Sequence, residues 1–168
     1  LPAGKGKRWA RTGAAQALLG AWQVSGFFSA YQGQPFTVMA AGTSLNAPGN
    51  IQTADQVLAG VKKLGNVGLG TTFYDPLAFR AVTQARFGNS GRNILRGPGV
   101  VNTNLSLLKT FRLAERMQLM FRAEAYNLTN TPHFNNPANN VSDPASFLSI
   151  SSAQPDERQL RCGLRLAF

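Results

Sequence analysis

Apolar side chains recur at every second position in four stretches of the chain, at residues 16–31, 100–113, 117–130 and 157–168. This period is typical of extended strands with one oily and one polar face, whereas a helix repeats its apolar positions every three or four residues. The last stretch is the clearest, because apolar residues occupy every second position there up to the end, with Gln159, Arg161, Gly163 and Arg165 on the other face. Its apolar positions are Leu160, Cys162, Leu164, Leu166 and Phe168.

The stretch 117–130 is ambiguous on its own. It is rich in Met, Ala, Glu, Arg and Leu, which favour helix, and some of its apolar residues also fit a helical stripe. The preceding stretch 100–113 has Asn and Thr where a helix would have better helix formers, so it is predicted to be a strand. Only Ala114–Arg116 separate the two stretches. We therefore predict a hairpin.

Two long connections, 32–99 and 131–156, are dense in Gly, Pro, Asn and Ser. Loops of this length are uncommon in compact soluble domains and usually carry function or are disordered. Within the first connection, residues 54–65 are compatible with a helical turn or a short strand. Residues 74–79 predict a turn that leads into an extended piece.

The four predicted strands are long for a globular protein, in which strands of about 5–6 residues are most frequent. They suit a bilayer, which a tilted strand of about 9–11 residues can cross. A short turn at one end and long loops at the other are typical of outer-membrane barrels. We therefore predict an all-β fold: an antiparallel transmembrane β-barrel segment of about four long strands and two long extracellular loops. The barrel would close only in the full-length protein.

This fold assigns the two faces of the strands to lipid and to a wet lumen. The predicted lipid-facing residues are Trp22, Val24, Phe28, Leu105, Leu107, Phe111, Leu119, Phe121, Leu160 and Leu164. The predicted lumen-facing residues are Arg112, Arg122, Glu124 and Arg165. Phe27 and Lys109 depart from the alternation. Phe27 falls on the polar side, and Lys109 falls on the apolar side near a strand end, where we expect its amine to snorkel to lipid headgroups.

The formal net charge of +10 raises the possibility of a nucleic-acid partner. The basic residues are scattered, however, except for Lys5, Lys7, Arg8 and Arg11, and few aromatic residues alternate with them as a stacking surface requires. We therefore expect no nucleic-acid partner. Anionic lipid headgroups would suit the same cations.

No cofactor, metal site or enzymatic activity is predicted. A single cysteine, Cys162, excludes an internal disulfide or a cysteine-cluster metal site. The single histidine, His133, lies in an Asn/Pro-rich stretch and is expected to be a loop residue. Residues 5–30 imitate a signal peptide, but Gln23 and Ser25 interrupt the apolar part and the chain begins with Leu1. No apolar run is long enough for a membrane helix, and we expect the chain to be part of a longer protein.

Several stretches, in order along nearly the whole chain, resemble the C-terminal end of TonB-dependent outer-membrane receptors of the Oar-like group. The stretches are LLGAWQVSGFFSAYQGQPFTV (18–38), FGNSGRNILRGPG (87–99), NTNLSLLKTFRL (102–113), QLMFRAEAYNLTNTPHF (118–134) and the closing strand. The resemblance implies a location in the bacterial outer membrane, amid lipid and lipopolysaccharide. It implies a barrel of about 22 strands, plugged by an N-terminal domain and energised by the TonB complex. The implied function is import of a large or scarce solute.

The resemblance also implies a signal for the barrel assembly machinery in the closing strand. In this motif a polar residue is followed by Gly and then by two apolar or aromatic residues at alternate positions; the matching residues are Arg161, Gly163, Leu166 and Phe168. The turn Ala114–Arg116 is then periplasmic, and both long loops are extracellular.

Two other functions remain open from the sequence. The chain could anchor a surface adhesin, in which each of three chains donates about four strands to one barrel. It could also be a soluble basic β-protein that binds nucleic acid. The imported substrate is not predicted, because siderophores, saccharides, peptides and proteins all fit the resemblance.

Overall fold

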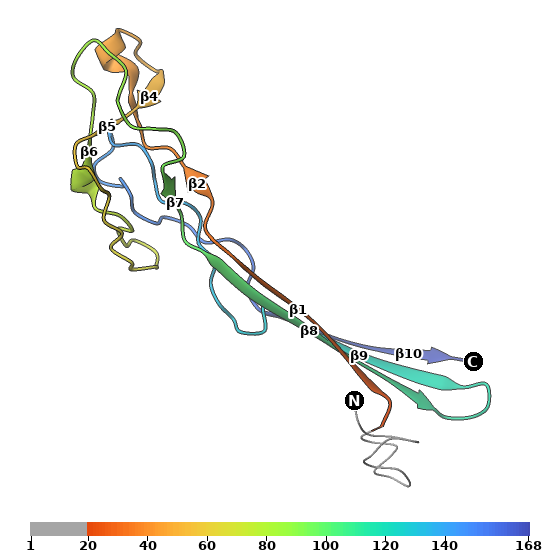
Figure 1. The fold of residues 1–168 in the computed structure, drawn as a ribbon. Coiled ribbons are helices and arrows are strands. Elements are labelled where there is room, and N and C mark those ends of the chain that lie inside the picture. The colour runs from red at the N-terminus through yellow and green to blue at the C-terminus, as the bar shows by residue number, and fades with distance from the viewer. Residues whose placement is uncertain (1–19) are drawn as a thin grey trace. The chain divides into compact units, whose positions relative to one another are not determined.

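Four long strands form one antiparallel sheet in the computed structural model, which describes residues 20–168 (Figure 1). The strands are β1 (Trp22–Tyr31), β8 (Val100–Arg112), β9 (Gln118–Tyr126) and β10 (Gln159–Ala167). Hydrogen bonds join them in the order β1-β8-β9-β10, so β1 and β10 are the edges of an open sheet. The predicted all-β fold with about four long strands is confirmed. Residues 16–19 of the first predicted strand lie outside the described residues.

The chain divides into two compact units. The sheet unit comprises the residues up to Ser29 together with Val101–Thr131 and Asp156–Phe168, and it contains most of the four long strands. The loop unit comprises Ala30–Val100 and Pro132–Pro155, which correspond closely to the two long connections in the sequence.

β8, β9 and β10 are paired in continuous register. β9 pairs along its whole length with β10 on one side, and Glu124 in its middle lies opposite Arg161. On the other side Glu124 lies opposite Ser106 of β8. In β1, a Cβ atom placed on Gly26 would lie 3.6 Å from the carbonyl oxygen of Asn104, so the two backbones are in direct contact.

A tight turn joins β8 to β9. The Leu113 N–H donates to the Met117 carbonyl at 2.9 Å, and the Met117 N–H donates to the Ala114 carbonyl at 3.3 Å. The predicted hairpin is confirmed. β9 is a strand despite its helix-favouring composition, because pairing on both sides outweighs the small differences in intrinsic propensity.

At its other end β9 stops earlier than predicted. Asn127 and Asn130 have left-handed backbones, with φ of 46° and 52°, which a strand cannot continue. The buried side chain of Asn127 donates to the carbonyls of Thr131 (3.0 Å) and Asp156 (2.8 Å) and accepts from the Thr131 N–H (3.0 Å). The backbone N–H of Asn127 donates to Asn104 Oδ1 at 2.9 Å. This Asn127 clasp ties the end of β9 to β8 and to the chain that enters β10.

The loop unit contains six short strands in three antiparallel pairs and two 3₁₀ turns. The pairs are β2 (Pro35–Phe36) with β7 (Leu95–Arg96), β3 (Met39–Ala41) with β4 (Ile51–Thr53), and β5 (Asp55–Gln56) with β6 (Phe79–Arg80); the turns are Gly42–Leu45 and Pro76–Ala78. Residues 54–65 therefore contain a short strand rather than a helical turn. The turn predicted at 74–79 is confirmed, because the Asp75 carboxylate accepts the Leu77 N–H at 3.0 Å and β6 follows.

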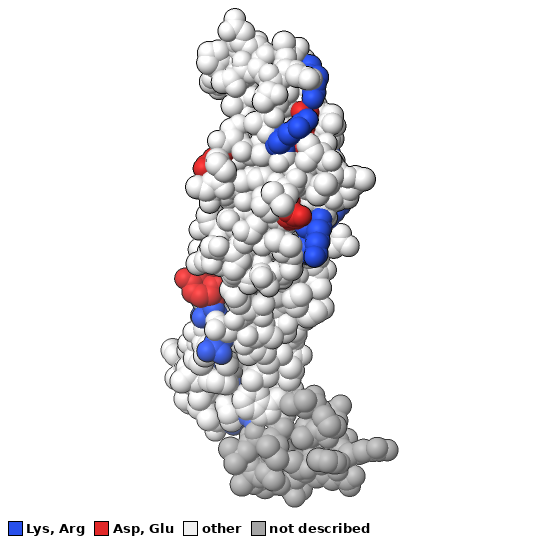
Figure 2. All heavy atoms as spheres, turned by 90° about the vertical axis from the view of Figure 1, so that its left-hand side faces the viewer, with Lys and Arg blue, Asp and Glu red and all other residues white. Residues whose placement is uncertain are grey.

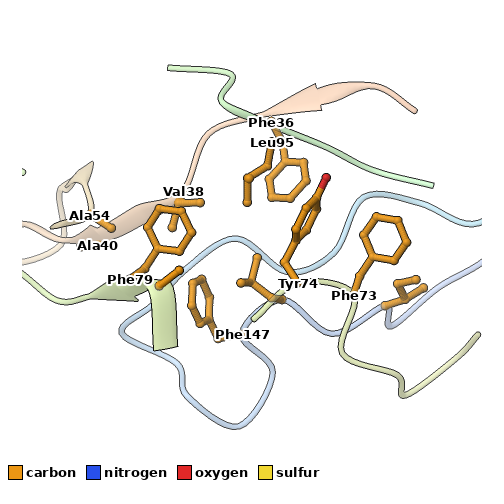
Figure 3. Packing of buried hydrophobic residues seen from close by; sticks show 12 residues of the cluster. Phe36, Val38, Ala40, Ala54, Phe73, Tyr74, Phe79, Leu95 and Phe147 are labelled. Atoms are coloured by element: carbon orange, nitrogen blue, oxygen red, sulfur yellow. The ribbon is translucent and has the colours of Figure 1, made fainter. Parts of the chain in front are cut away.

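The loop unit has a hydrophobic core of its own (Figure 3). The rings of Phe79 and Phe147 meet edge to face with centroids 6.2 Å apart, which joins residues of the two connections. Each large apolar side chain buried in this way contributes about 1.5–3 kcal/mol. The two long loops are therefore folded together. The core residues are Phe36, Val38, Ala40, Ala54, Phe73, Tyr74, Ala78, Phe79, Leu95, Phe147, Leu148 and Ile150.

One buried carboxylate, Asp55, adds an ion pair to this core. Arg86 Nη1 and Nη2 donate to its two oxygens at 2.8 Å each, and the Asn89 N–H donates to it at 3.3 Å. Arg80 lies 4.0 Å away. The hydrogen bonds from Arg86 hold the pKa of Asp55 below its ordinary value of 3.8, although burial acts in the opposite direction. The ionised carboxylate is therefore the stable form in the folded loop unit.

We expect Asn127→Ala to lower the free energy of unfolding more than Asn130→Ala does. Both residues have left-handed backbones, so alanine adds a similar strain of about 1–2 kcal/mol at either position. Only Asn127→Ala also breaks the clasp. Breaking it costs a further amount of stability, about 1–3 kcal/mol for each buried group left unsatisfied. Urea unfolding followed by tryptophan fluorescence measures the difference. Equal destabilisation by the two variants would show that the hydrogen bonds of the clasp contribute no measurable stability, and that only the strain of alanine in a left-handed backbone matters.

Acid should loosen the loop unit through Asp55. Because the folded-state pKa is lowered, the ion pair stabilises the unit above pH 3.8, and this contribution is lost as pH falls through the lower folded-state value. We expect hydrogen exchange at Gln56 and Asn89, corrected for intrinsic rates, to accelerate in that range. In the Asp55→Asn variant these two amides should exchange faster already at about pH 5, and their exchange rates should depend less on pH. Asp143→Asn, at an exposed aspartate of the same unit, should match the unmodified chain; identical profiles for all three proteins would contradict the prediction.

Candidate membrane-spanning surface

The strand register places all the predicted lipid-facing residues on one side of the sheet. Leu107 lies opposite Ala123, which lies opposite Cys162, and residues opposite each other share a face. In β1 the Trp22 ring meets the Phe121 ring edge to face, with centroids 6.1 Å apart. The apolar face is defined by Trp22, Val24, Phe28, Leu105, Leu107, Phe111, Leu119, Phe121, Leu160 and Leu164.

Much of this apolar face is uncovered. Phe28, Leu160 and Leu164 are 65%, 68% and 70% exposed. Burying apolar surface stabilises a protein by about 25 cal/mol per Å², so leaving a row of such side chains in water forgoes most of that gain. Single exposed apolar residues are normal on soluble proteins, but a continuous face of them marks an interaction with a membrane or another protein. The apolar face therefore requires apolar surroundings.

The opposite face, called the polar face, carries the predicted lumen-facing residues. Glu124 forms an ion pair with Arg122 of its own strand, and the Arg161 guanidinium lies 5.1 Å from the centre of the Tyr126 ring. Phe27 is an exception on this face and is 64% exposed. The other polar or charged members include Gln23, Ser25, Asn102, Asn104, Ser106, Arg112 and Arg165.

Lys109 is the one cation on the apolar face in the described strands, and it does not extend outward as predicted. Its side chain is 2% exposed, and Nζ donates to the Gly20 carbonyl at 3.0 Å. The ammonium lies 5.0 Å from the centre of the Trp22 ring and 4.8 Å from that of Phe111. The predicted snorkelling is therefore wrong. A carbonyl and two aromatic rings partner the charge within the sheet unit, which avoids exposing it on an apolar surface.

The lengths of the strands match the thickness of a bilayer. β1, β8, β9 and β10 contain 10, 13, 9 and 9 residues, and a tilted membrane strand needs about 9–11. In the view of Figure 2, charged side chains occur in a few groups and most of the visible described surface is uncharged.

Residues 1–161 match the family model of the outer membrane beta barrel domain. The chain belongs to this family. It is therefore a β-barrel protein of the bacterial outer membrane, and its open sheet is part of the barrel wall. No curated protein and no solved structure matches the chain.

Among residues 20–168, no helix is long and apolar enough to cross a membrane.

The single histidine and the single cysteine lie in different units. His133 is buried in the loop unit, and its carbonyl accepts the Gln154 N–H at 2.7 Å. Cys162 is an exposed free thiol on the apolar face. No cluster of three His, Cys, Asp or Glu side chains suited to a metal ion occurs in the described part of the chain.

Sequence reasoning missed two structural sites, the Asn127 clasp and the Asp55–Arg86 ion pair. Asn127 had a weak signal, because an asparagine next to polar residues often ends a strand with a left-handed backbone. The partners of Asp55 are 31 and 34 positions away, and no local pattern connects them.

We expect an arginine to be tolerated at Leu108 and not at its neighbour Leu107. Leu107 lies on the apolar face and Leu108 on the polar face of β8. If the apolar face meets lipid, Leu107→Arg costs about 2–4 kcal/mol near the middle of the bilayer, whereas Leu108→Arg leaves the cation in water. Refolding yields of the intact protein into lipid vesicles measure the difference. Equal yields, or a greater loss for Leu108→Arg, would contradict the assignment of the faces.

Proposed function

We propose that the chain forms the C-terminal part of the barrel of a TonB-dependent transporter of the Oar-like group, which imports a large or scarce solute. The observation that carries the proposal is the contrast between the two kinds of connection in the sheet. A tight turn joins β8 to β9, while the long segments fold into a unit with a hydrophobic core. Barrels with short periplasmic turns and long outer loops expose such loops to the medium, where a solute is first captured.

In this proposal the apolar face meets lipid and lipopolysaccharide, and the polar face lines the lumen. The four strands of the described sheet are fewer than the eight of the smallest membrane barrels, so other strands complete the wall. A plug domain in the lumen would lie against the polar face and contact the TonB complex, which supplies the energy for import. The cations Arg112, Arg122 and Arg165 would then be solvated by the lumen.

The proposed assembly signal is in β10. Arg161, Gly163, Leu166 and Phe168 match the motif; Phe168 is 95% exposed, and the space next to Gly163 is open. As an edge strand, β10 offers unpaired backbone groups through which the barrel assembly machinery could bind it by strand addition. The terminal aromatic ring would then lie at the periplasmic interface.

The transporter proposal predicts binding to TonB. The intact protein, purified from outer membranes in detergent, should form a complex with the isolated periplasmic domain of TonB in a pull-down. A porin of the same membrane, which needs no such energy source, is the control. Failure of the intact protein to bind would overturn the transporter proposal and leave the membrane barrel unaffected.

The open four-stranded sheet also fits the adhesin anchor, in which three chains share one barrel. The mass of the protein in detergent separates the two candidates. The transporter is a single-chain barrel, whereas the adhesin anchor is a trimer that dissociates only on heating. The soluble nucleic-acid-binding alternative does not fit a family of the outer membrane.

A further inference from the structure

We propose that the loop unit contains a binding site for a neutral saccharide, in a recess of about 200 Å³. The recess is lined by two aromatic residues, Tyr31 and Phe134, and by four amide residues, Gln34, Asn135, Asn136 and Gln154, and no charged residue lines it. All of these residues belong to the loop unit. The proposal rests on the proposed function and names the class of solute that this part of the transporter recognises.

Close approach of three segments builds the wall of the recess. A Cβ atom on Gly33 would lie 2.0 Å from the Gly97 carbonyl oxygen, and a Cβ atom on Gly97 would lie 2.1 Å from Asn136 Oδ1. Real side chains cannot approach a backbone so closely, so glycine is required at position 33 for its segment to meet residue 97. At position 97 a side chain would displace the Asn136 amide from its place against the backbone. This packing holds the lining residues in place before any ligand arrives.

Hydrogen bonds hold the same segments together. The Gly97 N–H donates to the Gln34 carbonyl at 3.0 Å, and the Gln154 N–H donates to the His133 carbonyl at 2.7 Å. Asn135 bonds to Ser152 twice, from its N–H to the carbonyl at 3.1 Å and from Nδ2 to Oγ at 3.0 Å. A preorganised site loses less entropy when a ligand binds.

The amide groups of the recess are available to a ligand. Among residues 20–168, the side chains of Gln34, Asn136 and Gln154 make no hydrogen bond, and Gln34 and Gln154 are exposed. Each amide offers two donors and an acceptor oxygen. A sugar hydroxyl both donates and accepts, so several converging amides match a polyhydroxylated ligand better than a charged one.

The aromatic residues favour the same class of ligand. Tyr31 is 55% exposed, and Phe134 is partly buried against the core. An aromatic ring offers a flat apolar surface, which suits the C–H side of a sugar ring. A ferric chelate or a nucleotide carries negative charge and would favour a recess lined by lysine or arginine. The uncharged lining therefore points to a neutral ligand.

The test uses the intact protein purified from outer membranes in detergent, on an array of neutral mono- to tetrasaccharides. Each saccharide that binds is then titrated by calorimetry, with citrate as the anionic comparison. We expect Gln34→Ala with Gln154→Ala to weaken binding about tenfold or more, since each amide hydrogen bond accounts for about two- to tenfold. Gln32→Ala, at an exposed glutamine outside the lining, should bind normally.

A second pair of variants tests the aromatic contact. Tyr31→Ala should weaken saccharide binding, whereas Tyr31→Phe keeps the ring and should retain most of it. The site is overturned if no neutral saccharide binds, if citrate binds in its place, or if the lining variants bind as well as Gln32→Ala. If the unmodified protein binds TonB but no neutral saccharide, the recess alone is refuted, whereas failure of the unmodified protein to bind TonB would refute the transporter.

Discussion

The pairing register of the strands is the constraint on which the membrane surface depends. Side chains alternate between faces, so a slip of one residue in one strand would turn all its side chains over. In the present register Leu107, Ala123 and Cys162 form one row, and Ser106, Glu124 and Arg161 form the next. A slip of β10 would put its arginines on the lipid side, at about 2–4 kcal/mol each near the middle of the bilayer. For each arginine, this penalty is larger than the difference in intrinsic helix propensity between any two ordinary residues, such as those that favour helix in β9.

The two units are stabilised by different interactions. Among residues 20–168, the loop unit contains the main cluster of buried apolar residues, and its Asp55–Arg86 ion pair lies beside them. The sheet unit leaves most of its large apolar residues partly or fully exposed, and backbone pairing and the Asn127 clasp hold it together. Its missing stabilisation must come from lipid and from neighbouring strands. Detergent should therefore act chiefly on the sheet unit and acid on the loop unit.

The strands could be predicted from sequence because their signal is local. Alternation in β8 and β10 is visible within about ten residues, and the short link to β9 resolved the one ambiguous stretch. The core of the loop unit could not be predicted, because its contacts join distant residues such as Phe79 and Phe147. The same holds for the recess, where Gly33, Gly97 and Asn136 meet. A glycine shows only that the backbone is free, and not which segment approaches it.

The distribution of charge follows from the same alternation. In the described strands, arginines occupy the polar face, and the cation on the apolar face, Lys109, is covered by Trp22 and Phe111. A nucleic-acid surface would gather exposed cations with free aromatic rings on one side. In this chain the Arg161 guanidinium lies over Tyr126, and Arg122 pairs with Glu124. The cations of the four long strands are therefore either directed to the polar face by the alternation or covered by aromatic rings.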